Sequence, residues 1–177
     1  MTESARDRIL NATAHLLVTQ GGDAVTIAAV AQTAKISKGG LFYHFASKEL
    51  LIEGLVQRYI AAFDQLIHTA GTEPGAATRA YVTSAKNNSG PAAQAVLALF
   101  AAAVVSPKAM ESLRDHYRQW QDRLNNDQLP PQVSWTIRLT VDGLWLADTF
   151  SLAQPSPTAR RAILDGLEAM IDAALIT

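Results

Sequence analysis

The sequence predicts an all-α protein of about nine helices, with an N-terminal helix-turn-helix domain followed by a C-terminal helical domain. Apolar residues recur at steps of three and four positions along most of the 177-residue chain, which is the spacing of an amphipathic helix. Capping residues, glycines and prolines separate these segments. No segment alternates apolar and polar residues over several positions, so strands are not expected. We place the first domain at residues 1–50 and the second at residues 51–177.

The N-terminal domain is predicted to hold one longer helix and two short ones. Each is preceded by a serine or threonine that can accept a hydrogen bond from a free amide at the helix start. A capping box with Asp7 completes the first of these caps. Gly21-Gly22 ends the first helix, and residues 35–37 separate the two short ones. The helices are predicted over residues 4–20, 27–34 and 38–44, with Ser4, Thr26 and Ser37 as their N-caps.

The rest of the chain is predicted to form six helices, the first of which belongs to both domains. Ser47 can cap that long helix, and Glu49 lies at the positive end of its dipole. Three of the later segments carry a proline where the first helical residue is expected, a position that proline tolerates. The predicted helices cover residues 48–69, 76–87, 91–105, 107–126, 132–152 and 157–176.

Composition and motifs exclude several classes of protein. The longest uninterrupted apolar run has eleven residues, 95–105, whereas a membrane span needs about 20. The polar N-terminus does not resemble a signal peptide, so we expect a cytoplasmic protein. No cysteine is present, and the four histidines are far apart, so no metal site is expected. No nucleotide-binding or hydrolase motif appears, and we expect neither a cofactor nor enzymatic activity.

Net charge does not by itself indicate a nucleic-acid partner. The whole chain carries −1, and residues 1–50 hold five basic and four acidic side chains. This excess of one positive charge has the right sign for a DNA contact but is too small to decide the question. The geometry of the two short helices has to decide it.

Two short helices joined by three residues cannot bury enough surface alone, so the first helix and the long helix 48–69 must supply their core. Such an arrangement is typical of a module that places its second short helix in the major groove of DNA. The residues predicted to face the core are Ile9, Leu16, Leu17, Ile27, Val30, Ala31, Ile36, Leu41, Phe42 and Leu50.

The outward residues of the second short helix suit contact with DNA. Lys38 offers an ammonium group to phosphate, and the glycines at 39 and 40 allow the backbone to approach closely. Tyr43 and His44 have polar tips that can position the protein on the DNA backbone. The alternative is that these two rings pack against the long helix. Thr26 and Lys48 flank the motif and can bind phosphate, although Lys48 could also be an ordinary solvated charge.

Residues 36–51, together with 26–31, closely resemble the signature of the TetR family of bacterial repressors. The resemblance implies a homodimer that binds double-stranded operator DNA and is released by a small-molecule inducer. Position 40 often carries a small polar side chain in that family, and position 42 is frequently tyrosine. We therefore expect Phe42 to belong to the core more than to the contact surface. Family members contact DNA at the position of Phe42 too, and the other contacts that the resemblance implies are Thr26, Ser37, Lys38, Gly39, Gly40, Tyr43, His44 and Lys48.

The C-terminal domain offers weaker signals for a ligand site. Aromatic residues at helical spacing usually form a core, but in helices that surround a cavity they can also line a pocket. A carboxylate within the mostly apolar run 139–152 either faces solvent or is buried with a partner. Arg138 or a ligand amine could be that partner for Asp142 or Asp148. The candidate ligand contacts are Tyr81, Phe100, Tyr117, Trp120, Trp145 and Asp148.

The last two helices, 132–152 and 157–176, are predicted to form the dimer interface as a four-helix bundle with a twofold mate. Their apolar stripes include Val133, Ile137, Val141 and Leu144 in the first helix. In the second helix they include Ile163, Leu167, Met170, Ile171, Ala174 and Leu175. The alternative is that both stripes only close the core of one protomer.

The function predicted from these patterns is an operator-binding repressor that a small molecule releases from DNA. Two other classes of protein are the alternatives. A ligand-independent DNA-binding or protein-interaction module would have a closed C-terminal core without voids. An all-helical enzyme would need converging titratable groups in a cleft, and no spacing in the sequence supports one.

Overall fold

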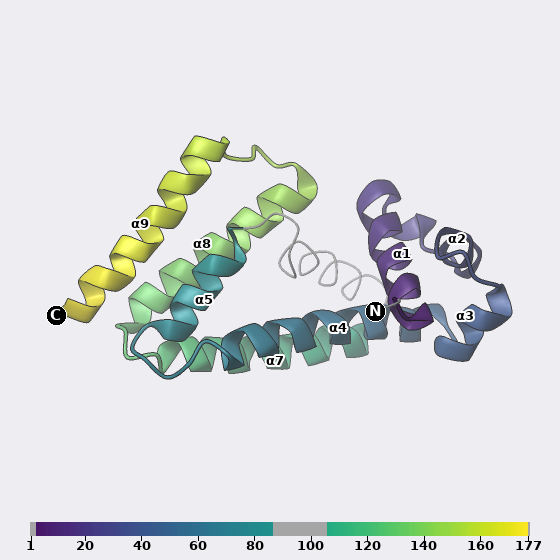
Figure 1. Ribbon diagram of the computed structural model, residues 1–177, viewed down its shortest axis with the longest axis horizontal. Coiled ribbons are helices and arrows are strands. Elements are labelled where there is room, and N and C mark those ends of the chain that lie inside the picture. Colours follow the sequence, from purple (N-terminus) through teal and green to yellow (C-terminus); the bar gives the residue numbers. More distant parts are fainter. Residues whose placement is uncertain (1–2, 87–105, 177) are drawn as a thin grey trace. The chain divides into compact units, whose positions relative to one another are not determined.

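The computed structural model describes residues 3–86 and 106–176, and within these ranges helices joined by turns and loops make up the chain, without strands (Figure 1). This confirms the all-α prediction. The helix predicted over residues 91–105 lies outside the described residues. No helix in the described part is long and apolar enough to cross a membrane. The elements are α1 (Ala5–Gln20), η1 (Gly22–Ala24), α2 (Ile27–Thr33), α3 (Lys38–His44), α4 (Lys48–His68), α5 (Ala76–Ser84), α7 (Pro107–Asn125), α8 (Pro131–Phe150) and α9 (Pro157–Ile176).

The chain divides into two compact units. One contains α1 to α3, α4 as far as Tyr59 and the start of α7 as far as Leu113. The other contains the remainders of α4 and α7 together with α5, α8 and α9. Two helices, α4 and α7, therefore contribute residues to both units.

Side-chain caps start the helices of the first unit, as the sequence predicted. The Ser4 hydroxyl accepts a hydrogen bond from the Asp7 amide at 3.1 Å, and Thr26 accepts one from the Ala29 amide at 3.1 Å. Ser37 accepts from the Gly40 amide at 3.0 Å. These bonds satisfy amides that have no partner inside their own helix and so fix where each helix begins.

The turn between α2 and α3 depends on Lys35, whose φ of 54° is left-handed. Past this residue the chain reverses, and the Ile36 amide donates to the Ala31 carbonyl at 3.0 Å. This bond closes the end of α2 in the manner of a Schellman motif. A lysine in this conformation costs roughly 1–2 kcal/mol. The surrounding turn therefore has to hold it in place.

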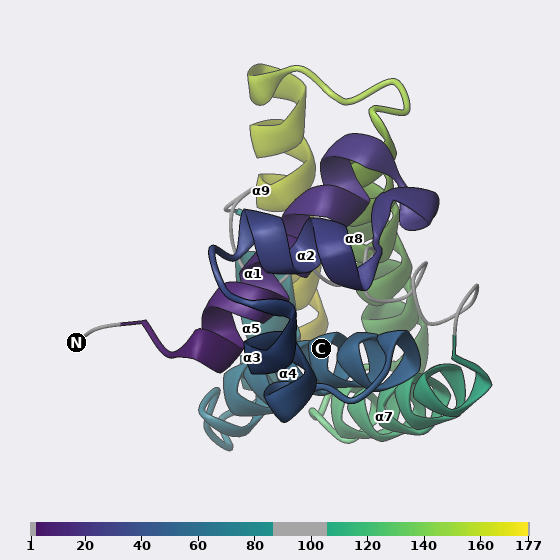
Figure 2. The ribbon, with the colours of Figure 1, turned by 90° about the vertical axis from the view of Figure 1, so that its right-hand side faces the viewer.

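Helices α1, α2 and α3 lie close together in the first unit (Figure 2). Buried residues of these helices and of α4 form one hydrophobic core. Phe45 is buried at its centre, and its ring lies where a Cβ atom on Gly54 would stand, 2.5 Å from the Phe45 Cε1 atom. The glycine in α4 is what allows the ring to pack against that helix. The predicted core residues that are buried are Ile9, Leu16, Leu17, Val30, Ala31 and Leu41, and Ile27 and Ile36 are partly buried.

Two of the predicted core residues are exposed. Phe42 is 48% exposed and Leu50 is 46% exposed, so the prediction that they face inward was wrong. The reason is helical phase: Leu41 and Phe45, four residues apart, occupy the inward face, and Phe42 is turned about 100° away from Leu41. In α4, Leu51 and Ile52 take the inward positions instead of Leu50.

In the second unit α5, α8 and α9 lie side by side (Figure 1). Helix α5 begins after Gly75, whose φ is 76°, and no side chain within its own segment caps it. The cap comes from Asp127, whose Oδ2 atom accepts from the amide and the hydroxyl of Thr78, both at 2.8 Å. Arg123 binds the other carboxylate oxygen of Asp127 at 2.9 Å. A buried carboxylate 49 residues away therefore anchors the start of α5.

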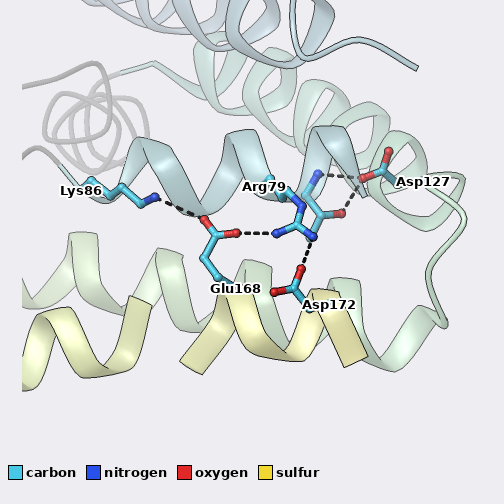
Figure 3. Close-up of polar contacts among 6 residues, drawn as sticks. Arg79, Lys86, Asp127, Glu168 and Asp172 are labelled. Atoms are coloured by element: carbon cyan, nitrogen blue, oxygen red, sulfur yellow. Dashed lines mark hydrogen bonds and ion pairs between the residues drawn. The ribbon is translucent and has the colours of Figure 1, made fainter. Parts of the chain in front are cut away.

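Ion pairs join α5 to α9 (Figure 3). The Arg79 guanidinium donates to Glu168 at 2.8 Å and to Asp172 at 2.5 Å, and Lys86 lies 3.3 Å from Glu168. The hydrogen bond to Asp172 raises the pKa of Arg79 above its ordinary value. These charges are partly solvated, so they orient the two helices more than they stabilise them.

Candidate DNA-binding surface and ligand site

Helix α3 has one exposed face, and apolar residues on its other side are buried in the core. Leu41 is fully buried and Phe45, at the end of the helix, is 5% exposed, so both hold α3 against the core. Tyr43 is 87% exposed, and its ring meets the His44 ring edge-on at 5.1 Å between centroids. Tyr43 therefore does not pack against α4, which was the alternative interpretation. The other predicted contact residues on this helix are exposed or half-buried: Ser37, Lys38, Gly39, Gly40 and His44.

Thr26 and Lys48 lie at helix starts that flank α3. Thr26 is exposed at the N-terminus of α2. Lys48 is half-buried, and its ammonium donates to the Gly22 carbonyl at 3.3 Å. This bond ties the start of α4 to the turn that precedes α2, a link that sequence spacing does not reveal. Since an ammonium has three donors, one bond to Gly22 leaves N–H groups for a further acceptor.

A basic groove and an exposed arginine in the first unit were not predicted as site features. The guanidinium carbon of Arg6 lies 5.3 Å from the centre of the Phe45 ring, at the end of α3. The groove, of about 330 Å³, lies between α1 and the end of α2. Basic side chains from α1 and from the turn after α2 line it, which local spacing along α1 alone does not show. Its lining residues are Glu3, Arg8, Asn11, Ala12, His15, Thr33, Ala34 and Lys35.

In the second unit the predicted aromatic residues meet around Phe63 of α4, which was not among the predicted ligand contacts. The Phe63 ring centroid lies 5.1 Å from that of Tyr81, 4.6 Å from Trp120 and 5.7 Å from Trp145. Tyr81 and Trp145 stack at 5.4 Å, and Tyr117 touches Trp120 at 5.0 Å. All but Tyr117 are at most 3% exposed. Phe100, the remaining predicted aromatic contact, lies outside the described residues.

The two carboxylates of α8 are partnered. Asp142 accepts a hydrogen bond from the Tyr81 hydroxyl at 2.6 Å, and Arg138 lies 3.5 Å away, as the sequence suggested. Burial raises the pKa of the Asp142 carboxyl above its ordinary value, against the lowering effects of Tyr81 and Arg138. Asp148 pairs with Arg160 of α9 at 2.8 Å. Arg160 also donates to the Ala85 carbonyl at 2.8 Å and so joins three helices.

A pocket of about 410 Å³ opens beside Trp120. Its size falls in the range of small-molecule sites. The Trp120 indole donates to Asp64 at 2.7 Å, and Arg123 donates to the Gly71 carbonyl at 2.9 Å. The lining therefore combines the Trp120 indole with one carboxylate, one arginine and one histidine. The lining residues are Asp64, Ile67, His68, Gly71, Thr72, Gln119, Trp120 and Arg123.

Two family descriptions match the chain. Residues 9–55 match bacterial regulatory proteins of the tetR family, and residues 75–172 match the tetracyclin repressor-like C-terminal domain. The second match alone covers more than half of the 177 residues. The chain belongs to the tetR family. It is therefore a DNA-binding transcriptional regulator, which confirms the function predicted from residues 36–51, and family membership implies a regulatory rather than a catalytic role.

Similar proteins extend the likeness over nearly the whole chain of this tetR-family member. The transcriptional regulator BetI of Paraburkholderia phytofirmans is 28% identical over 97% of this chain and 80% of its own. A tetR-family protein from Rhodococcus RHA1 superposes with a TM-score of 0.72 at 19% identity, covering 98% of both chains. A regulator from Saccharomonospora viridis, solved in complex with choline, gives 0.70 at 20% identity over 95% of both. The two structures show a shared fold.

Proposed function

We propose that this tetR-family regulator is a homodimeric repressor that leaves its operator when a small molecule binds the second unit. The observation that carries the proposal is the surface of α3. Lys38 and Tyr43 are exposed there, while Leu41 and Phe45 fix the helix in the core. A short helix held in this way, with a cation at its start, has the shape and charge to enter the major groove.

The proposed DNA contacts divide by chemistry. The ammonium groups of Lys38 and Lys48 bind phosphates, and the latter does so while it holds Gly22. Thr26 and Ser37 already accept bonds from backbone amides through their oxygen atoms, so their hydroxyl hydrogens are directed to phosphate oxygens. The remaining contacts are backbone approach and positioning by polar ring tips, from Gly39, Gly40, Tyr43 and His44.

Binding is tested with DNA from the region next to the protein's own gene, across a range of salt concentrations. Six or more phosphate contacts would lower affinity by about 10³ or more between 50 and 200 mM salt. Lys38→Ala is expected to reduce the slope against log salt by about two, because the dimer then neutralises two phosphates fewer, one for each protomer. Lys108→Ala is the matched control, because Lys108 is 81% exposed and is paired with Glu53 on α4. Binding that ignores salt would refute the proposal.

Dimerisation is proposed through exposed residues of α8 and α9. The stripe predicted from Ile137 to Leu144 packs inside the unit, where Ile137 and Val141 are fully buried, and Ile171 of α9 is buried too. A second set of large apolar residues remains on the surface and leaves an apolar area available to a twofold mate. Its members are Trp135, Leu139, Leu146 and Phe150 of α8, and Met170, Leu175 and Ile176 of α9.

Light scattering tests this interface. Leu139 and Leu146 are 55% and 46% exposed, so replacing both with glutamate should leave the fold intact but place four charges in the interface of a dimer. The expected result is a monomer with unchanged helix content. Leu50→Glu, at an equally exposed leucine of the first unit, should leave the mass unchanged. A dimer that survives the double substitution would place the interface elsewhere.

The ligand is proposed to bind in the pocket beside Trp120, which is a predicted ligand contact and lines the pocket; Tyr81, Tyr117, Trp145 and Asp148 are not among its lining residues. A metabolite extract, and separately choline, the molecule bound by the S. viridis regulator, are added to the protein–DNA complex. The proposal expects one of them to release the DNA. Thr72→Trp, at an exposed lining position, should abolish that release by filling the pocket. Thr69→Trp, at a position outside the lining, is the control.

A ligand-independent regulator is the second candidate, and one observation favours it. Rings from three other helices surround Phe63, with every centroid within 5.7 Å of its own. If neither the extract nor choline releases DNA, and native mass spectrometry of protein purified from cells shows no bound small molecule, this second function replaces the first.

A further inference from the structure

The groove between α1 and the end of α2 has no part in the DNA contacts proposed above. None of its lining residues is among those contacts. Ala12 and Ala34 line it and are both buried, so small side chains form its floor. Its volume of about 330 Å³ lies at the lower end of the range of small-molecule sites. The hollow is therefore large enough for a small molecule.

Basic side chains reach the groove from both sides. Arg8 and His15 are seven residues apart, so they lie on one face of α1, about 10 Å apart along its axis. Lys35 comes from the turn after α2. All three residues are exposed. Among the described residues, none of these three side chains has a hydrogen-bond or ion-pair partner, so they are available to a ligand.

The acidic residue of the lining, Glu3, is already engaged. Asn11 donates a hydrogen bond to Glu3 and accepts one from Arg58 of α4 at 2.7 Å. Burial lowers the pKa of Arg58, and the negative charge of Glu3 opposes this lowering. The charge of Glu3 is thus offset by Arg58. The groups left free in the groove are mainly donors, led by the guanidinium of Arg8 and the ammonium of Lys35.

Lys35 brings its charge to the groove from a strained backbone conformation. Its φ of 54° is left-handed, a region that glycine adopts without strain. The hydrogen bond that closes the turn joins backbone atoms of Ile36 and Ala31, so the turn makes no use of the lysine side chain. Strained residues other than glycine cluster at binding and switch sites. This supports a role for the Lys35 ammonium in the groove.

We propose that the groove binds a small phosphorylated metabolite, as an effector site separate from the ligand pocket proposed in the second unit. A phosphate group offers three strong acceptor oxygens and nearly two negative charges. These match the guanidinium fork of Arg8 and the ammonium of Lys35, and the Thr33 hydroxyl adds a neutral donor. A carboxylate has one oxygen and one charge fewer, so it satisfies this set of donors less well.

The bound metabolite acts on DNA binding through its charge. Lys38 follows Lys35 by three residues, so their Cα atoms are at most about 11 Å apart. This distance is close to the Debye length of about 10 Å at 0.1 M salt. An anion held by Lys35 therefore lowers the positive potential at the start of α3. Two occupied grooves in a dimer should weaken DNA binding about threefold at that salt concentration.

The binding test uses the full-length protein without DNA and sodium pyrophosphate as the probe, with sodium chloride holding the ionic strength constant. Amide NMR shifts of Lys35 and Ile36 should saturate with a Kd of about 1 mM or lower. Arg8→Ala and Lys35→Gly should each weaken binding at least about fivefold. Lys108→Ala, at an exposed lysine of the first unit outside the lining, is the control and should bind as the wild type does.

Thermal unfolding separates ligand contact from a structural role. Lys35→Gly removes the charge but relieves the left-handed backbone, so its melting temperature should not fall while its affinity for pyrophosphate does. DNA affinity is then measured with and without pyrophosphate at equal ionic strength. The wild type should show the threefold decrease, and Lys35→Gly should show none.

The inference is overturned if pyrophosphate does not bind, or if it binds both groove variants as tightly as the wild type. Binding that leaves DNA affinity unchanged would refute the effector role. The inference also fails if Arg8→Ala or Lys35→Gly reduces the slope of DNA affinity against log salt by about two, because the groove would then hold operator phosphates. None of these outcomes affects the proposed function, which depends on α3 and the second unit.

Discussion

The two units use their polar side chains in opposite ways. In the first unit the proposed contact residues point outward, as Tyr43 does at 87% exposure, and what lies beneath them is an apolar core. In the second unit the candidate residues are buried or already paired, as Asp148 is with Arg160 and Asp142 with Tyr81. The first unit thus presents donors to a partner, whereas the second uses most of its donors to join its own helices.

This difference indicates where a substitution should affect binding and where it should affect stability. Exposed side chains contribute little to folding, so their removal should change DNA affinity without changing the melting temperature. Buried pairs hold helices that are distant in sequence, so their removal should lower stability. The predictions below test this contrast, beginning with the largest expected effect.

Asp127→Ala should destabilise the second unit most. Its side chain is 1% exposed, caps α5 through Thr78 and is paired with Arg123. The substitution therefore leaves the Thr78 amide and hydroxyl without this acceptor and leaves the Arg123 guanidinium only its bond to the Gly71 carbonyl. The expected decrease is about 3–5 kcal/mol in the free energy of unfolding, measured by urea titration. Asp115→Ala, at an exposed pair with Arg118, should cost less than about 0.5 kcal/mol. A small decrease in the free energy of unfolding for Asp127→Ala would contradict this contrast between the two units.

Arg160→Met should cost about 2 kcal/mol, because it leaves Asp148 and the Ala85 carbonyl without their donor. The side chains of Arg160 and Asp148 are 12% and 15% exposed, so water cannot fully replace the bond. Arg161→Met, at the exposed neighbouring position, serves as the control. Equal melting temperatures for the two variants would mean that this pair does not hold α8 to α9.

Ser37→Ala removes the cap of α3 and should cost about 1 kcal/mol of stability. Because α3 is the proposed reading helix, DNA affinity should fall as well. Ser37→Asp, which retains a capping oxygen, should restore the melting temperature but not DNA binding, since a carboxylate repels phosphate. If Ser37→Asp restores both the melting temperature and DNA binding, Ser37 does not contact DNA.

Asp142→Asn should have the smallest effect, and its sign depends on pH. Burial raises the pKa of Asp142, so the folded protein holds this proton more tightly than the unfolded chain does. The contribution of Asp142 to stability is therefore greatest in acid and falls as pH rises through the raised pKa. The variant should gain stability relative to wild type as pH rises above the ordinary carboxyl pKa of 3.8, as thermal unfolding at several pH values would show. A relative decrease over that range would show that the pair with Arg138 outweighs burial.

The contrast also explains what the sequence could predict. The caps at Ser4, Thr26 and Ser37 act over three residues, so local spacing is sufficient to find them. The exposure of Phe42 was missed because apolar character alone predicts burial, while the inward face of so short a helix was already filled by Leu41 and Phe45.

Contacts between residues that are far apart in the sequence could not be predicted from local spacing. Asp127 reaches Thr78 across 49 residues, and Arg160 reaches Ala85 across 75. Phe63 belongs to the apolar side of α4, but only the packed structure shows that Tyr81, Trp120 and Trp145 surround it. The aromatic residues could be named from the sequence, whereas their common centre could not.

The most direct test of the account measures DNA affinity and thermal unfolding on the same preparation of the double variant Lys38→Ala, Tyr43→Ala. Both side chains are exposed on α3, so the account predicts an affinity at least about 100-fold weaker, or about 2.7 kcal/mol, with the melting temperature unchanged within about 2 °C. Unchanged affinity would contradict the account, and so would an affinity that falls only in proportion to a lower melting temperature.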